Sequence, residues 1–159
     1  MNEHSHLVNQ FYTAFQQRDY KTMQECYHPE VEFSDEVFLL LKGKQAMAMW
    51  HMLISGAKDA NLKIDFSTIY AKDDTIHCNW EARYKFSLTG RKVHNKIQAT
   101  FWFKDGLIIR HEDKFDFYRW SRMAFGFKGT LLGWTSFFKK KVQEGVDKRL
   151  KKFMDGNKM

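Results

Sequence analysis

A run of fourteen residues, from Thr75 to Leu88, alternates strictly between apolar and polar side chains. The apolar side chains all stand at even positions: Ile76, Cys78, Trp80, Ala82, Tyr84, Phe86 and Leu88. Alternation with a period of two is typical of a strand with one buried face, because successive strand side chains point to opposite sides of a sheet. The run therefore predicts a sheet that is covered on one face.

Two more strands follow and predict an antiparallel meander. Residues 93–103 and 107–117 place their apolar side chains at odd positions. Gly90-Arg91 suits a two-residue turn, which pairs even with odd positions. Pairing odd with odd positions across Asp105-Gly106 needs a three-residue loop, Lys104 to Gly106, with Gly106 at a bulge.

This register sets one polar side chain among small neighbours. His111 is expected opposite Ala99, and Ala99 opposite Ala82. Asp113 is expected opposite Ile97. Because small side chains in the middle of a concave face leave space, we expect an apolar pocket to open at the His111 row.

The residues before these strands predict helices that can cover the sheet. Between residues 7 and 15 apolar side chains recur every four residues, which is typical of an amphipathic helix. Asp19 is expected to cap a short second helix that stops at His28-Pro29. Residues 31–37 alternate as a short strand, and a third helix follows Gly43. The order predicts an α+β domain with a strongly curved antiparallel sheet.

The basic charge is concentrated in the last quarter of the chain. Residues 1–120 carry 16 basic and 16 acidic side chains, whereas residues 121–159 carry 10 and 3. In this last segment lysines surround an apolar stripe with helical spacing: Phe138, Val142, Val146, Leu150 and Phe153. Such a helix can lie on an anionic membrane. Because the stripe is narrow, we expect residues 121–159 to form a helical extension that docks on the domain of residues 1–120, or across a dimer partner.

Several classes of protein do not fit this composition. No run of about 18 apolar residues predicts a membrane span, and the first residues are too polar for a signal peptide. Cys26 and Cys78 suit buried thiols in a reducing compartment better than a disulfide framework. The neutral body gives no indication of nucleic-acid binding. We expect a cytoplasmic protein.

Four segments resemble the nuclear transport factor 2-like superfamily, and within it the SnoaL-like polyketide cyclases. They are VNQFYTAFQQRDYKTM, CYHPEVEFSD, LKGKQAMAMW and DGLIIRHEDKFD, and the resemblance covers about residues 5 to 120. It implies a cone-shaped fold with helices packed into a curved sheet, and commonly a dimer through the outer face of the sheet. The superfamily includes isomerases, dehydratases, hydrolases, cyclases and non-enzymes, so the fold does not settle the function.

Three polar residues are candidates for catalysis. By the resemblance, His111 and Asp113 match polar positions of the final strand that often contribute to function. Burial would raise the pKa of Asp113 and suit it for general acid–base chemistry; the alternative is a carboxylate neutralised by a basic partner. His111 either assists Asp113 or is a satisfied core histidine. Asp35 is either a second acidic group of the site or the cap of a turn.

Six further residues are expected to line the pocket and to bind the substrate. They are Tyr12, Tyr27, Trp50, Trp80, Tyr84 and Asn95. Most of the aromatic members would serve as core, and a buried Asn95 amide bonded to backbone is the alternative for that residue. His4 and His6 resemble a metal pair but stand near the chain end, and His111 with Asp113 lacks a third ligand, so we expect no metal. No Gly-rich phosphate loop or paired CxxC motif occurs, and we expect no cofactor.

Two main hypotheses of function remain open, beside a third in which the basic tail recruits the protein to a surface. One is a protein that binds a small hydrophobic, oxygenated molecule and acts on it as a cofactor-free isomerase, cyclase or dehydratase through Asp113. The other is a non-catalytic ligand-binding or protein-interaction module of the same fold. An epoxide hydrolase is less favoured, because Arg110 has the wrong parity to face the pocket.

Overall fold

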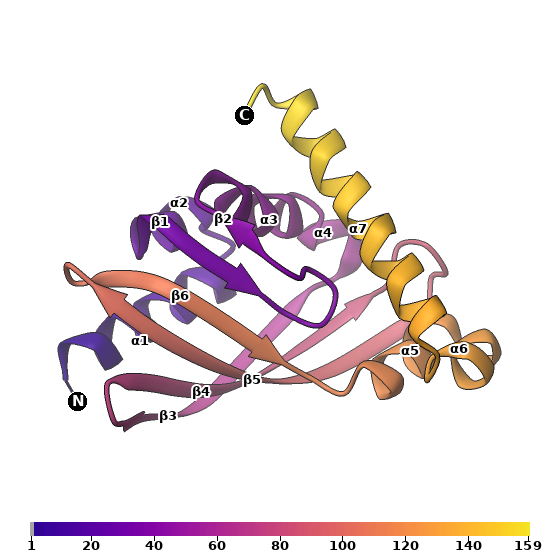
Figure 1. Ribbon diagram of the computed structural model, residues 1–159, viewed down its shortest axis with the longest axis horizontal. Helices are drawn as coiled ribbons and strands as arrows, with labels where there is room; N and C mark the ends of the chain where they lie inside the picture. The colour runs from indigo at the N-terminus through magenta and orange to yellow at the C-terminus, as the bar shows by residue number, and fades with distance from the viewer. Residues whose placement is uncertain (1) are drawn as a thin grey trace.

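The computed structural model describes residues 2–159 and is built on one curved, unclosed sheet of six strands (Figure 1). The strands are β1 (Tyr27–Ser34), β2 (Leu41–Lys42), β3 (Lys63–Lys72), β4 (Thr75–Lys85), β5 (Lys92–Lys104) and β6 (Leu107–Lys114). Their order across the sheet is β2-β1-β6-β5-β4-β3. All neighbours are antiparallel except β1 and β6, which run parallel. The sheet is therefore mixed, with an antiparallel meander from β3 to β6 and one parallel pair. Together with the helices it gives the predicted α+β fold.

Seven helices complete the described chain. They are α1 (Glu3–Gln16), α2 (Tyr20–Glu25), α3 (Lys44–Ser55), α4 (Ala57–Ala60), α5 (Phe117–Phe125), α6 (Phe127–Leu132) and α7 (Ser136–Gly156). Asp19 caps α2 as predicted, because its carboxylate accepts the Thr22 backbone N–H at 3.1 Å. The helix ends earlier than predicted, at Glu25, and Tyr27 already belongs to β1.

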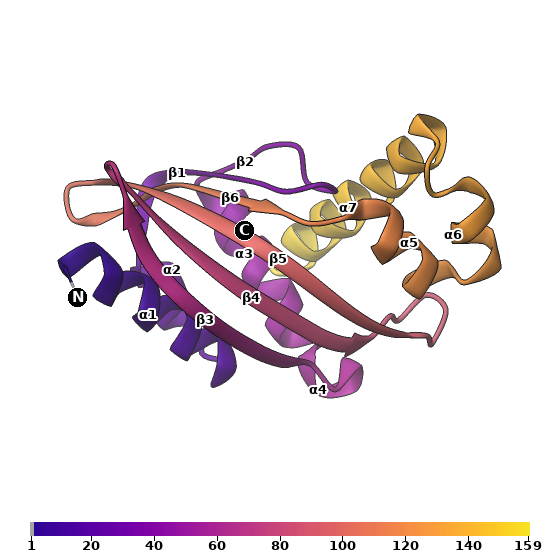
Figure 2. The ribbon, with the colours of Figure 1, turned by 90° about the horizontal axis from the view of Figure 1, so that it is seen from below.

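Helices and sheet form a half-open cone (Figure 2). The concave face of the sheet is filled by α1 and α3, whose largest inward side chains are fully buried aromatic rings, among them Phe11, Phe15 and Trp50. At the opposite end from the β3–β4 turn, α5 and α6 close the sheet, and α7 returns along α3 (Figure 1). Leu150 of α7 joins the main core, and Phe138 joins a smaller core with Trp120.

The pairing of β4, β5 and β6 differs from the predicted register. Ala99 lies opposite Asp113 on one side and opposite Cys78 on the other, whereas His111 lies opposite Phe101. The predicted row of His111, Ala99 and Ala82 is therefore wrong. On the concave face, the row of small side chains consists of Cys78, Ala99 and Asp113.

Both hairpin loops explain this error. The β4–β5 loop spans residues 86–91 instead of two, because α5 holds it open: Thr89 Oγ1 donates to the Ala124 carbonyl at 2.6 Å and Arg91 Nε to the Met123 carbonyl at 2.9 Å. The β5–β6 loop is the two-residue Asp105-Gly106 turn, with φ of 54° and 77°. A bulge at Ile109 then adds one unpaired residue to β6. Beyond this bulge, odd positions of β5 again lie opposite odd positions of β6, as the sequence predicted.

Candidate active site

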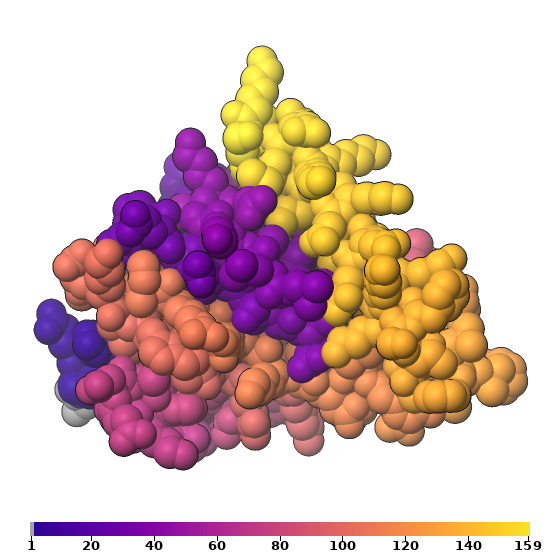
Figure 3. Space-filling view, viewed as in Figure 1, coloured from indigo at the N-terminus to yellow at the C-terminus, as the bar shows by residue number. Residues whose placement is uncertain are grey.

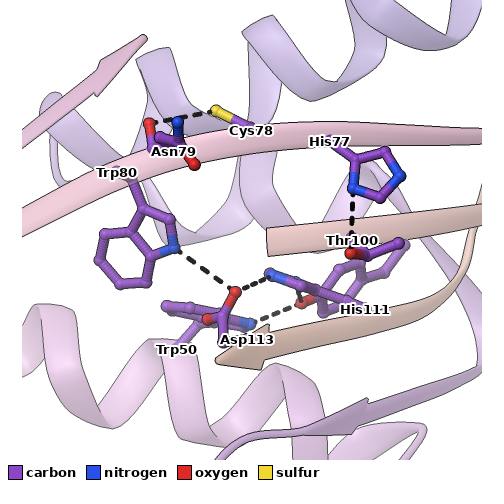
Figure 4. A network of polar contacts seen from close by, with 9 residues as sticks. Trp50, His77, Cys78, Asn79, Trp80, Thr100, His111 and Asp113 are labelled. Atoms are coloured by element: carbon purple, nitrogen blue, oxygen red, sulfur yellow. Dashed lines mark hydrogen bonds and ion pairs between the residues drawn. The ribbon is translucent and has the colours of Figure 1, made fainter. Parts of the chain in front are cut away.

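Asp113 is a buried carboxyl in the middle of the concave face. It comes from β6, is 5% exposed, and faces Ala99 across the ladder. Its Oδ1 lies 2.8 Å from His111 Nε2 and accepts from Trp80 Nε1 at 3.4 Å (Figure 4). Within residues 2–159, no lysine or arginine forms an ion pair with this carboxyl. Among the described residues, this carboxyl is therefore held only by hydrogen bonds with His111 and Trp80.

His111 connects Asp113 to a chain of hydrogen bonds that crosses the cone. Tyr27 Oη lies 2.8 Å from His111 Nδ1, and Trp50 Nε1 donates to Tyr27 Oη at 2.7 Å. Because Tyr27 already accepts from Trp50, its own proton is free for His111 Nδ1, and Nε2 then carries the ring proton toward Asp113. A neutral His111 and an ionised Asp113 satisfy every donor in this chain.

The surroundings of His111 are packed instead of open. Its ring is fully buried, and the ring centroids of Phe101, Phe33, Phe11 and Trp50 lie 4.2, 5.0, 5.6 and 5.8 Å away. The pocket predicted at the His111 row is therefore wrong, because the true row places Phe101 where Ala99 was expected. Small side chains lie one row further along, beside Asp113.

Two oxygen atoms, one on Tyr12 and one on Asp113, form no hydrogen bond within the described residues. In the described part of the chain, Tyr12 Oη has no hydrogen-bond partner although the residue is fully buried. Asp113 uses only Oδ1 in the hydrogen bonds found there, which leaves Oδ2 free. Burial, and next the charge of Asp113, hold the pKa of Tyr12 well above its usual value. Tyr12 thus keeps a neutral hydroxyl within electrostatic reach of the Asp113 carboxyl.

Asp35 lies at the end of β1 and closes a turn. Its Oδ1 accepts the backbone N–H groups of Val37 and Phe38 at 2.8 and 2.6 Å. Burial raises the pKa of Asp35 to about 7, the two N–H donors oppose this, and the charges of Asp113 and Glu36 add to it. The structure thus places Asp35 as a turn cap, within electrostatic reach of Asp113.

Tyr84 and Asn95 lie nearer the end of the cone that α5 covers. Tyr84 Oη accepts from Trp120 Nε1 at 2.8 Å, and burial raises the pKa of Tyr84 to about 12. Asn95 is 7% exposed and lies opposite Ala82. Neither residue takes part in the hydrogen-bond chain of Asp113.

The site also contains a residue that sequence reasoning did not select. Cys78 stands in the small-residue row with Ala99 and Asp113, and burial raises the pKa of its thiol to about 12. Its even position already placed it on the buried face of its strand. The strand register sets Cys78 in the same row as Asp113. The sequence did not reveal this register, because the loop lengths differ from those expected.

Two surface hollows are lined by neither Asp113 nor Tyr12. One, of about 440 Å³, is lined by α1 and the start of β3, including Gln16 and Arg18. The other, of about 570 Å³, is lined mainly by β4 and β5, with Trp80, Glu81 and Lys96 among its residues. In residues 2–159 no group of three or more acidic, histidine or cysteine side chains could hold a metal ion.

The same fold occurs in solved structures of low sequence identity. A proposed SnoaL-like polyketide cyclase from Jannaschia sp. CCS1 is 14% identical, with a TM-score of 0.65 over 77% of this chain and 91% of that one. An LEH-like epoxide hydrolase from M. tuberculosis is 19% identical, with a TM-score of 0.60 over 82% and 91%. TerC, co-crystallised with polyporic acid, is 16% identical, with a TM-score of 0.64 over 77% and 98%.

The sequence itself places the chain among these proteins at the level of a family. No curated protein matches it. The model of the SnoaL-like domain matches residues 8–111, which include most of α1, all of α3, strands β1 to β5 in full and β6 as far as His111. The chain therefore belongs to the SnoaL-like domain family, with the fold of nuclear transport factor 2-like proteins.

Proposed function

We propose that this protein binds a small hydrophobic molecule with an oxygen function beside Asp113 and moves a proton on it without a cofactor. One observation carries the proposal: a buried carboxylate with no cationic side chain keeps one oxygen free, within electrostatic reach of a buried hydroxyl that has no partner in the described residues. Unpaired polar groups in an apolar interior reduce stability, and they are typical of sites that bind a ligand.

The two free groups suit complementary roles. The Asp113 carboxylate would take a proton from a carbon next to a carbonyl group, and the C–H electron pair would move onto the carbonyl oxygen as an enolate. Tyr12 Oη would donate a hydrogen bond to that oxygen. Asp113 would then return the proton to another carbon, so that the substrate is isomerised and the carboxylate is restored.

The hydrogen-bond chain behind Asp113 would hold the carboxylate in place. His111 and Trp80 both donate to Oδ1, which leaves Oδ2 available to a ligand. Trp50 and Tyr27 fix the tautomer of His111. Among isomerisation, cyclisation, dehydration and epoxide opening, the last has least support, because Arg110 points outward and pairs with Glu112. The likeness to a polyketide cyclase and to a structure with a bound small molecule supports the binding role.

The experiment is proton exchange into a panel of cyclic ketones in D₂O, followed by proton NMR. We expect the wild-type protein to catalyse exchange at carbons next to the carbonyl group of at least one ketone. Asp113→Asn should lower that rate by about 100-fold or more, because a positioned general base contributes about 10²–10⁴-fold. Tyr12→Phe should lower it less.

Glu112→Gln is the matched control, since Glu112 is the next residue on β6 and faces the opposite side of the sheet. It should leave the exchange rate unchanged. If Asp113→Asn exchanges protons as fast as the wild type, Asp113 is not the base. If no ketone exchanges although one binds, the protein is not a catalyst of this class.

The non-catalytic alternative has one observation in its favour. The interior around His111 is filled by aromatic rings, and neither surface hollow is lined by Asp113 or Tyr12. A binding or interaction module needs no open route to Asp113. Ligand binding without proton exchange would select this alternative.

A further inference from the structure

The short helix α6 packs with its small residues inward. A Cβ atom at Gly129 would lie 1.9 Å from the Ser121 carbonyl oxygen of α5, and one at Gly133 would lie 2.7 Å from Ser121 Cβ. Both glycines are buried, and so is Ser121. The two helices are therefore in backbone contact, and α6 has no room to bury a large side chain against α5.

The large apolar side chains of this segment consequently point outward. Phe127 is 78% exposed, Leu131 53%, Trp134 73% and Phe137 69%. We name these four residues the α6 knob. Trp134 Nε1 donates to the Leu131 carbonyl at 2.9 Å, which fixes the indole beside α6. Grouped exposed apolar residues of this size mark interaction sites.

The knob lies in a segment whose charged residues are all basic. No acidic residue occurs between Asp116 and Glu144, whereas six basic residues do: Arg119, Arg122, Lys128, Lys139, Lys140 and Lys141. Lys141 Nζ lies 5.0 Å from the centre of the Phe137 ring. Lys139 forms an ion pair with Glu36 at 2.6 Å. The other lysines of this segment form no ion pair within residues 2–159. The segment projects from the end of the molecule, beside the covered end of the cone (Figure 3).

We propose that the α6 knob binds the surface of an anionic lipid bilayer. Tryptophan, phenylalanine and leucine with flanking lysines are the composition of segments that insert into the bilayer interface, and the lysines complement anionic head groups. A second copy of the chain fits less well, because a symmetric contact through the knob would place like charges together. In residues 2–159 no helix could cross a membrane, so the contact is peripheral.

This assignment moves the membrane contact from α7 to the knob. The apolar stripe of α7 is used by the protein itself, since Phe138 and Leu150 are 7% and 3% exposed. The proposal does not depend on the chemistry of Asp113, which lies in another part of the fold.

The test is co-sedimentation of the full chain with vesicles of phosphatidylcholine containing 30–40% phosphatidylglycerol. We expect binding to these vesicles and at least about tenfold weaker binding to phosphatidylcholine alone. Phe127→Ser with Trp134→Ser should weaken binding by about tenfold or more. Lys140→Glu with Lys141→Glu should have a similar effect.

Matched controls lie at the far end of the molecule, in the β3–β4 hairpin. Tyr70→Ser removes an aromatic side chain that is 47% exposed, and Lys72→Glu reverses a charge. Both should bind vesicles as the wild type does. All substituted residues are exposed, and an unchanged thermal melt verifies that each variant folds.

Three outcomes would overturn the proposal. The wild type fails to bind the anionic vesicles, or the knob variants bind as well as the controls, or the knob substitutions dissociate a dimer and leave vesicle binding intact. The last result would assign the knob to a second copy of the chain.

Discussion

Two carboxyl groups near the concave face differ in what surrounds them. Asp35 accepts two backbone N–H groups and so stabilises a turn, whereas Asp113 is held only by a histidine and a tryptophan. The turn cap of Asp35 involves only neighbouring residues, and the sequence already indicated it as one of two possible roles of Asp35. The arrangement around Asp113 joins residues from β1, α3, β4 and β6, so only the folded chain reveals it.

Asp113→Asn tests the charge state of this pair. With a neutral His111, the asparagine oxygen can accept the same two hydrogen bonds, so the free energy of unfolding should change by less than about 1 kcal/mol. Denaturant unfolding measures the change. A loss of about 3–5 kcal/mol would mean that an imidazolium had been left buried without its partner, which contradicts the neutral assignment.

Asp35→Asn should alter how stability depends on pH. The folded pKa of about 7 lies above the ordinary 3.8, so the folded protein binds more protons, and stability falls as pH rises between these values. The variant should match the wild type near pH 4 and exceed it at pH 8 by up to about 4 kcal/mol, the free-energy equivalent of this pKa difference. Its amide oxygen still caps the turn.

Urea unfolding at the two pH values provides the comparison, with Asp35→Ala as control because it also loses the cap. Asp35→Ala should be less stable than Asp35→Asn at both pH values. A wild type that is more stable than Asp35→Asn at pH 8 would show that the carboxylate favours folding there.

At the scale of elements, the periodic segments could be predicted and their pairing could not. The four-residue spacing up to Phe15 predicted α1, and the alternation after Thr75 predicted which side chains of β4 face inward. Register depends on loop length, and the β4–β5 loop is set by α5, which lies over 20 residues further along the chain. The parallel β1–β6 pair is likewise a contact between distant segments.

Gly129→Ala tests the close contact between α5 and α6. The added Cβ would meet backbone at 1.9 Å, so the substitution should destabilise the protein by about 1–3 kcal/mol or more. Gly145→Ala in α7 is the control, because nothing lies within 4 Å of its Cβ and alanine favours a helix by up to about 1 kcal/mol. Thermal melts decide between them, and equal melting temperatures for the two variants would refute the contact.

At the scale of the whole molecule, the cone is filled from inside and covered at one end. Aromatic rings from α1 and α3 pack on His111, and α7 lies along α3 with Leu150 in the core. The resemblance predicted this shape, but not that the interior would be so closely packed. A ligand that reaches Asp113 must therefore displace side chains near Tyr12.

The tryptophan indole N–H signals can report whether a ligand reaches Asp113. Trp50 and Trp80 donate into the hydrogen-bond chain of Asp113, whereas Trp102 is half-buried under Arg110 and Trp134 is exposed. Titrating the ¹⁵N-labelled protein with the ketone panel should shift the indole N–H signals of Trp80 and Trp50 and leave those of Trp102 and Trp134 in place. Shifts confined to Trp102 or Trp134, with Trp80 and Trp50 unmoved by every binding ketone, would contradict a ligand site beside Asp113.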